Sequence, residues 1–139
     1  MWINGSGAPL SIGRQIWNMQ RQFPDFEFRH KGMSWYGSLQ PTDESPRYRI
    51  KVTYRLPNSP QVWVLQPAIA ADAKHRYRNQ SLCLHYPRDG DWQPGFFLAD
   101  TILPWTAEWL YYYELWQIDP EHRWLGPEAS HSPRKRYIR

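Results

Sequence analysis

Reactive side chains gather around the single cysteine of this 139-residue chain, in the segment HRYRNQSLCLHYP at residues 75–87. Cys83 has a leucine on each side. Polar and aromatic side chains stand close to it in sequence: His75, Tyr77, Asn79 and His85. A cysteine thiolate is a strong nucleophile, and acyl transfer through it needs donors for the oxyanion that forms. Free cysteine is also among the residues most often buried. The segment therefore holds either a nucleophile or a packed thiol.

Two helices are predicted, one near each end of the chain. Residues 10–23 carry apolar side chains at helical spacing, with Pro9 suited to the first turn. The polar side chains of this segment are expected mostly on its opposite side: Arg14, Gln15, Asn18, Gln20, Arg21 and Gln22. Residues 103–118 repeat Trp or Tyr every three or four residues, which is typical of a core-facing stripe, and Asp119-Pro120 ends the segment.

Four short strands are predicted between the helices, joined by hairpin-length connections as an antiparallel meander. They are expected at residues 25–29, 34–40, 47–54 and 61–65. The third alternates without a break, with one face made of Tyr48, Ile50, Val52 and Tyr54. Residues 66–100 show no sustained period, and a long irregular loop of this kind is usually functional. The order of helix, four strands, loop and helix predicts a two-layer α+β fold.

Length and composition fit a single domain over residues 1–139, with a core at about 9–119 and a tail at 120–139. Trp124 and the residues after it are expected to dock this tail, which ends in basic residues, back on the domain.

No strong zinc pattern is present among His122, Glu128 and His131, so no metal is expected. No apolar run is long enough to span a membrane, and no signal-peptide pattern opens the chain, so a cytoplasmic location is expected.

The order of motifs resembles the ubiquitin-conjugating enzymes. WYGSLQPTDESP is similar to that family's second strand and the turn after it, and YRLPNSPQVWV to its Tyr-Pro-x-x-Pro-Pro-x-Val segment. SLCLHYP resembles the active-site segment, and Trp92-Gln93-Pro94 falls near the family's Trp-Ser-Pro. The resemblance covers about residues 10–118. It implies a ubiquitin-conjugating-enzyme-like fold with an N-terminal helix, a four-stranded antiparallel meander, an active-site loop and a C-terminal helix.

The chain departs from that family just before the cysteine. Aligned from Cys83 without a gap, Tyr77 matches a family tyrosine, and His75 stands where the family has the Asn of His-Pro-Asn. Ala73 and Lys74 replace the His and Pro of that motif. The His-x-Tyr-x5-Cys arrangement and the dense tryptophans resemble bacterial ubiquitin-conjugating-like proteins, some of which are encoded with CD-NTases in CBASS anti-phage systems.

The resemblance implies a cysteine-thioester acyl carrier or conjugating enzyme that acts on the C-terminus of a partner protein, a CD-NTase. Cys83 is the nucleophile in this interpretation. His75 either donates to the oxyanion, activates the thiol as an imidazolium, or only hydrogen-bonds the active-site loop.

Supporting roles are expected for the neighbouring side chains. Tyr77 is expected to pack and hold the loop, and Asn79 either to cap a turn of the loop or to serve as a second oxyanion donor. His85 is either an exposed neighbour or a residue that positions the acceptor amine. Trp92 is expected to pack on the loop.

No Gly-rich nucleotide-binding loop is present, so no cofactor is expected, and a separate activating enzyme or an already activated partner is required. A non-catalytic protein-binding scaffold on the same fold is the alternative, favoured by the missing His-Pro-Asn. Nucleic-acid binding through the basic tail is a third hypothesis, which no RNA- or DNA-binding motif supports.

Overall fold

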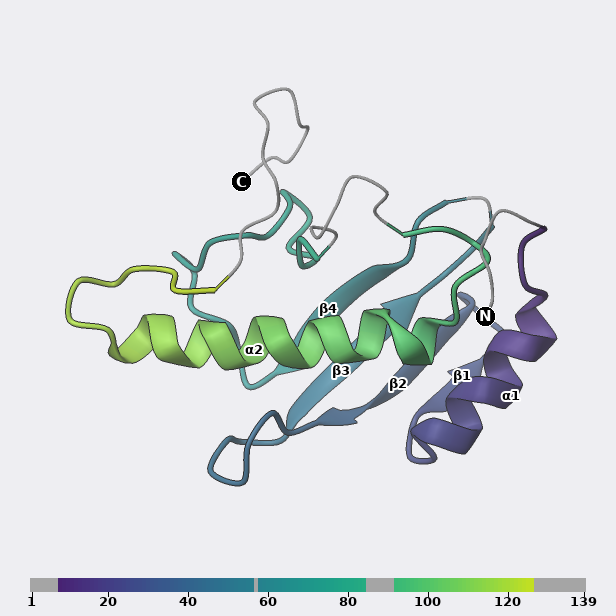
Figure 1. Ribbon diagram of the computed structural model, residues 1–139, viewed down its shortest axis with the longest axis horizontal. Coiled ribbons are helices and arrows are strands. Elements are labelled where there is room, and N and C mark those ends of the chain that lie inside the picture. The colour runs from purple at the N-terminus through teal and green to yellow at the C-terminus, as the bar shows by residue number, and fades with distance from the viewer. Residues whose placement is uncertain (1–7, 57, 85–91, 127–139) are drawn as a thin grey trace.

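An antiparallel sheet and a long helix across one of its faces make up the body of the protein, as the computed structural model shows (Figure 1). Residues 8–56, 58–84 and 92–126 are described. The elements are α1 Ile12–Gln22, β1 Glu27–Arg29, β2 Ser34–Leu39, β3 Tyr48–Thr53, β4 Gln61–Gln66, the 3-10 helix η1 Leu98–Asp100 and α2 Ile102–Ile118. This order confirms the predicted α+β plan of helix, four antiparallel strands and helix.

The four strands pair in the order β1-β2-β3-β4, each antiparallel to the next. Trp35 of β2 lies opposite Val52 of β3, which in turn lies opposite Val62 of β4. All three side chains are buried in the core. The alternation that predicted β3 is confirmed, because Tyr48, Ile50 and Val52 are buried while the residues between them face outward.

The first helix begins later than predicted. Ser11 is its N-cap and accepts the backbone N–H of Arg14 through its hydroxyl at 3.1 Å, so Pro9 precedes the helix instead of lying in its first turn. The prediction that the polar side chains of this segment face away from the core was wrong for Gln15 and Asn18, which are buried.

The second helix, α2, lies across the sheet in Figure 1. It ends at Ile118 with Asp119 as its C-cap, as the sequence predicted, and Pro104 lies in its first turn. Trp109, Tyr113 and Trp116 are buried, which confirms the core-facing stripe. No helix within the described residues is long and apolar enough to cross a membrane.

Candidate active site

A short hairpin brings His75 and Cys83 together. Arg76 and Leu82 form an antiparallel bridge, which places His75 directly opposite Cys83 on the neighbouring segment. The Cys83 N–H donates to the His75 carbonyl at 2.9 Å, and on the other side of the bridge the Tyr77 N–H donates to the Ser81 carbonyl at 2.8 Å. Two residues that the sequence separates by a loop are therefore fixed as a backbone pair.

The turn of this hairpin is closed by Asn79. Its side-chain oxygen accepts the backbone N–H of Ser81 at 3.0 Å and the Ser81 hydroxyl at 2.7 Å. The main-chain carbonyl of Asn79 accepts the indole N–H of Trp63 on β4 at 3.1 Å. The carboxamide oxygen is thus engaged in the turn, an arrangement consistent with turn capping. Gln80 takes the left-handed conformation that the turn requires, with φ of 78°.

The backbone of His75 is in the left-handed region, with φ of 63°. Histidine adopts this region more readily than most side chains do, and non-glycine residues held there are frequent at functional sites. The His75 carbonyl accepts two donors, the Cys83 N–H at 2.9 Å and the indole N–H of Trp109 at 3.2 Å. Its imidazole meets the ring of Trp124 edge-on, with centroids 4.8 Å apart. His75 is 8% exposed, so its ring is packed rather than open to water.

Cys83 itself is buried, with 3% of its surface exposed. Leu82 and Leu84 on either side of it are part of the hydrophobic core. The Leu82 N–H donates to the Val62 carbonyl at 2.9 Å, which fastens the cysteine-bearing segment to β4. A nucleophile in this position needs local opening of the surrounding loop before it meets a protein-sized acyl donor.

Trp92 packs where the loop returns to the core. Its indole N–H donates to the Thr101 hydroxyl at 3.0 Å, and its ring meets Tyr54 edge-on at 5.1 Å between centroids. These contacts are consistent with the packing role expected for it. Burial raises the pKa of Tyr54, so this phenol stays neutral at physiological pH. Tyr77 is half-buried and bonds through its main chain, while His85 lies outside the described residues.

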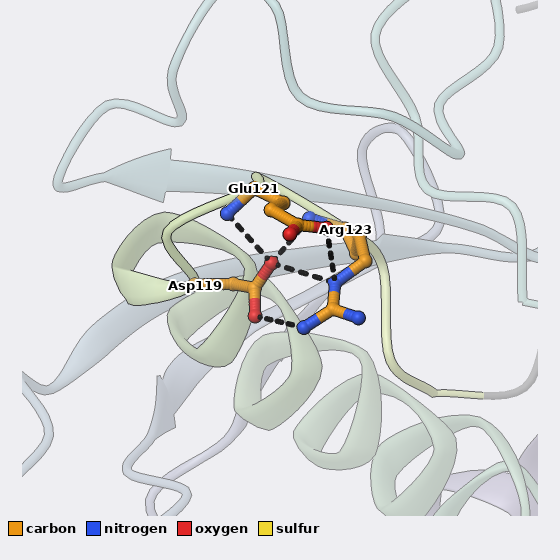
Figure 2. A network of polar contacts seen from close by, with 3 residues as sticks. All are labelled: Asp119, Glu121 and Arg123. Atoms are coloured by element: carbon orange, nitrogen blue, oxygen red, sulfur yellow. Dashed lines mark hydrogen bonds and ion pairs between the residues drawn. The ribbon is translucent and has the colours of Figure 1, made fainter.

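The C-terminal segment folds back onto the hairpin, as expected for Trp124. The chain reverses after α2 at Asp119, whose carboxylate accepts hydrogen bonds from the backbone N–H groups of Glu121 and Arg123 and from the Arg123 side chain (Figure 2). Trp124 then packs on His75 and on Trp109, with ring centroids 4.8 and 5.4 Å apart. Trp109 lies in the predicted core-facing stripe, but the sequence carries no local signal for its hydrogen bond to His75.

No metal site emerges from the part of the chain that the structure describes, because no group of three or more His, Cys, Asp and Glu side chains is placed to hold an ion. Of the residues considered for zinc, His122 contacts Asp72 at 3.9 Å and stacks on Trp116 at 4.1 Å. Glu128 and His131 lie outside the described residues.

A helix, an antiparallel sheet, a hairpin with the cysteine and a second helix, in this order, are consistent with an E2-like protein, that is, one of the ubiquitin-conjugating type. The family model described as the Type II CBASS E2 protein matches residues 15–132, which include the four strands, the hairpin and α2. The chain therefore belongs to this family, which gives it an E2-like role in CBASS and CBASS proteins as partners. No match was found among curated proteins.

Proposed function

We propose that the protein is a cysteine-thioester transferase that carries the C-terminal acyl group of a CD-NTase on Cys83, within a ubiquitin-conjugating-like fold. The observation that carries the proposal is the pairing of Cys83 with His75, through the 2.9 Å hydrogen bond from the Cys83 N–H to the His75 carbonyl. This pairing supports the proposal because it sets the only thiol of the chain opposite His75, the residue that the ungapped alignment from Cys83 assigns to the position of the family's asparagine.

The chemistry requires the thiolate of Cys83, because the neutral thiol is a poor nucleophile. Its sulfur attacks the carbonyl carbon of an activated C-terminus, which is a thioester or another activated acyl group brought by a separate activating protein. A tetrahedral oxyanion forms and collapses as the bond to the leaving group breaks, and the acyl group stays on Cys83. Attack by an amine then releases the Cys83 thiolate and leaves an amide.

His75 is the residue that this proposal places beside the oxyanion. Donation from its imidazole is one role, and activation of the thiol as an imidazolium is the other, while a purely structural contact is the alternative to both. Removal of one oxyanion donor typically costs about a hundredfold or more in rate. His75→Asn restores the side chain found in the wider ubiquitin-conjugating family, so a variant that keeps activity while His75→Ala loses it favours a donor.

The burial of Cys83 is part of the proposal. At 3% exposure the thiol is closed to a protein substrate, so binding of the activated partner has to open the loop around it. Such a closed resting state protects the thiolate from oxidation and from unproductive acylation. Faster alkylation of Cys83 when the partner is bound with its C-terminus unactivated, so that no thioester consumes the thiol, would support this opening.

The direct test mixes the purified chain with its activated CD-NTase and looks for a covalent adduct that thiol treatment removes. Cys83→Ala should form no adduct, and Cys83→Ser should form an ester that resists thiols. A CD-NTase without its C-terminal residues is the matched control on the partner. An adduct that persists in Cys83→Ala would overturn the proposal.

The alternative is a protein-binding scaffold without catalysis, which the same burial of Cys83 favours. It predicts that Cys83 resists iodoacetamide in the folded protein both with and without the partner, and that Cys83→Ala binds the partner as tightly as the wild type. Thioester formation by the wild type excludes it.

A further inference from the structure

One carbonyl joins α2 to the cysteine-bearing hairpin. The His75 oxygen accepts the Trp109 indole N–H at 3.2 Å and the Cys83 N–H at 2.9 Å. The carbonyl of a peptide has two lone pairs, so it can serve both donors at once. Trp109 and Cys83, which come from different parts of the chain, are therefore linked through a single oxygen atom.

The indole of Trp109 is held in place from two sides. The Tyr113 ring, one turn further along α2, stacks on it at 5.4 Å with 16° between the planes, and the Trp124 ring lies 5.4 Å away on the returning C-terminal segment. Trp109 is buried, so little freedom is left for its N–H to point elsewhere. The indole N–H therefore has a fixed position from which it donates to the His75 carbonyl.

The acceptor residue, His75, has a left-handed backbone conformation that surrounding contacts must stabilise. At φ of 63° a residue with a side chain pays a conformational cost, which persists only where surrounding contacts hold it. That conformation orients the His75 carbonyl toward both donors. Without the Trp109 bond, the peptide that follows His75 is free to relax toward an ordinary conformation, which would move both the imidazole and the partner strand that bears Cys83.

We propose that Trp109 is a positioning residue for the thioester chemistry of Cys83, acting through the His75 carbonyl. This inference rests on the proposed function for its catalytic consequence, but its structural part stands alone. The indole N–H fixes the left-handed His75 peptide, and that peptide fixes where Cys83 and the imidazole lie relative to each other. Tryptophan rather than phenylalanine is required at this position because the N–H, and not only the ring, takes part.

The test compares Trp109→Phe with Trp116→Phe. Both residues are buried on α2, but the indole N–H of Trp116 has no hydrogen-bond partner among the described residues. The control therefore removes the same atoms from the same helix without breaking a bond to the hairpin. A third variant carries β-(3-benzothienyl)alanine at position 109, which keeps the two fused rings and replaces the N–H by sulfur.

Three measurements are made on each variant. Amide hydrogen exchange of Cys83 should become about five- to tenfold faster in both Trp109 variants, as expected for loss of one hydrogen bond. Iodoacetamide should also alkylate Cys83 faster in these variants. Single-turnover thioester formation with the activated CD-NTase should nevertheless become about ten- to a hundredfold slower, at an unchanged half-saturating partner concentration, because the nucleophile is less well placed.

The opposite movement of alkylation and thioester formation separates positioning from general loosening of the fold. Trp116→Phe should leave Cys83 exchange and thioester formation near the wild-type values. If both Trp109 variants match Trp116→Phe in all three measurements, the proposal is wrong; if Trp109→Phe does not fold, the benzothienyl variant decides. A wild type that forms no thioester refutes the proposed function, while Cys83 exchange still shows whether Trp109 holds the cysteine.

Discussion

The carboxylate of Asp119 accepts two hydrogen bonds from the guanidinium of Arg123 in the turn that follows α2. One oxygen accepts the Arg123 Nε–H at 3.0 Å and the other accepts the Nη2–H at 2.9 Å (Figure 2). The Arg123 side chain is 58% exposed, so water screens the charge of this pair, and charge alone contributes little stability. The Asp119–Arg123 pair matters for geometry, because it fixes a turn that places the next residue, Trp124, against the ring of His75.

Replacement of Asp119 by Asn should weaken this turn in a pH-dependent way. The side-chain hydrogen bond from Arg123, with further backbone bonds, holds the pKa of Asp119 well below its usual range. A depressed folded-state pKa means that the contribution is present above the unfolded pKa of about 4 and is lost as pH falls through the folded value. The free energy of unfolding in urea, measured from pH 7 to pH 2, should therefore differ between wild type and Asp119→Asn by a constant amount above about pH 5, and the difference should shrink below about pH 4.

The control for this prediction is Glu121→Gln. The Glu121 carboxylate is exposed and only approaches Arg123 Nε at 3.7 Å, so its removal should change stability by no more than about 0.5 kcal/mol. Identical pH dependence in wild type and Asp119→Asn would show that the Asp119–Arg123 pair does not stabilise the turn.

Removal of the Trp124 ring should uncover His75. Trp124→Ala loses ring contacts with His75, Trp109 and Tyr112 and should lower the free energy of unfolding by about 2 kcal/mol. Diethylpyrocarbonate should modify His75 faster in this variant, as followed by mass spectrometry of the peptide that contains it. Leu125→Ala is the matched control, because Leu125 is 50% exposed.

A second variant should disturb the contact between Trp124 and His75 without changing either side chain. A Cβ atom on Gly126 would lie 2.3 Å from Cγ of Tyr112, so Gly126→Ala forces the returning segment away from α2. It should raise the modification rate of His75 while the Trp124 side chain is still present. Unchanged protection of His75 in both variants would show that the C-terminal segment does not cover it.

The side chain of Gln15 connects α1 to the first residue of η1 and to the loop before it through two hydrogen bonds. Its oxygen accepts the Leu98 N–H at 2.9 Å, and its amide donates to the Phe96 carbonyl at 2.9 Å. Gln15→Met keeps the length of the side chain but leaves both backbone groups without this partner, at a cost of about 2–4 kcal/mol in the free energy of unfolding. Chemical denaturation should show this loss, whereas Gln20→Met, at an exposed position of α1, should be nearly neutral. Equal effects at both positions would contradict this connection.

Gln15 also shows where reasoning from the sequence stops. The strands could be predicted because burial on one face imposes a period of two, as in Tyr48, Ile50 and Val52. The period of a helix likewise identifies an apolar stripe, but it assigns polar residues to solvent by default. Gln15 is 1% exposed because it serves backbone groups 81 and 83 residues further along the chain, and no local pattern records such a partner.

The candidate site divides in the same way. The motif around Cys83 pointed to this segment, and the ungapped alignment from Cys83 assigned His75 to the position of the family's asparagine. The left-handed backbone of His75 and the bond from Trp109 could not be predicted, because they depend on how α2 packs against a loop 34 residues earlier. Residue types that could carry out chemistry can be recognised in the sequence. The long-range contacts that position these residues cannot.

A partly buried hydrogen-bond cluster between α2 and the start of β3 should set the response of the protein to alkaline pH. Glu114 accepts the Tyr48 hydroxyl at 2.7 Å and the Ser45 hydroxyl at 2.8 Å. Burial raises the pKa of Tyr48, and the neighbouring Glu114 carboxylate raises it further. Because the folded-state pKa lies above the unfolded value of about 10, this contribution is complete below pH 10 and is lost as pH rises beyond it.

Tyr48→Phe should therefore flatten the loss of stability between about pH 10 and pH 12, while lowering the free energy of unfolding near pH 7 by about 1–2 kcal/mol through the missing hydrogen bond. Glu114→Gln should cost about 1–3 kcal/mol at neutral pH, since both hydroxyls lose a charged acceptor. Urea titrations across this range provide the measurement, with Tyr111→Phe as the control because Tyr111 is exposed on the same helix as Glu114. An alkaline transition as steep in Tyr48→Phe as in the wild type and in Tyr111→Phe would show that another group governs it.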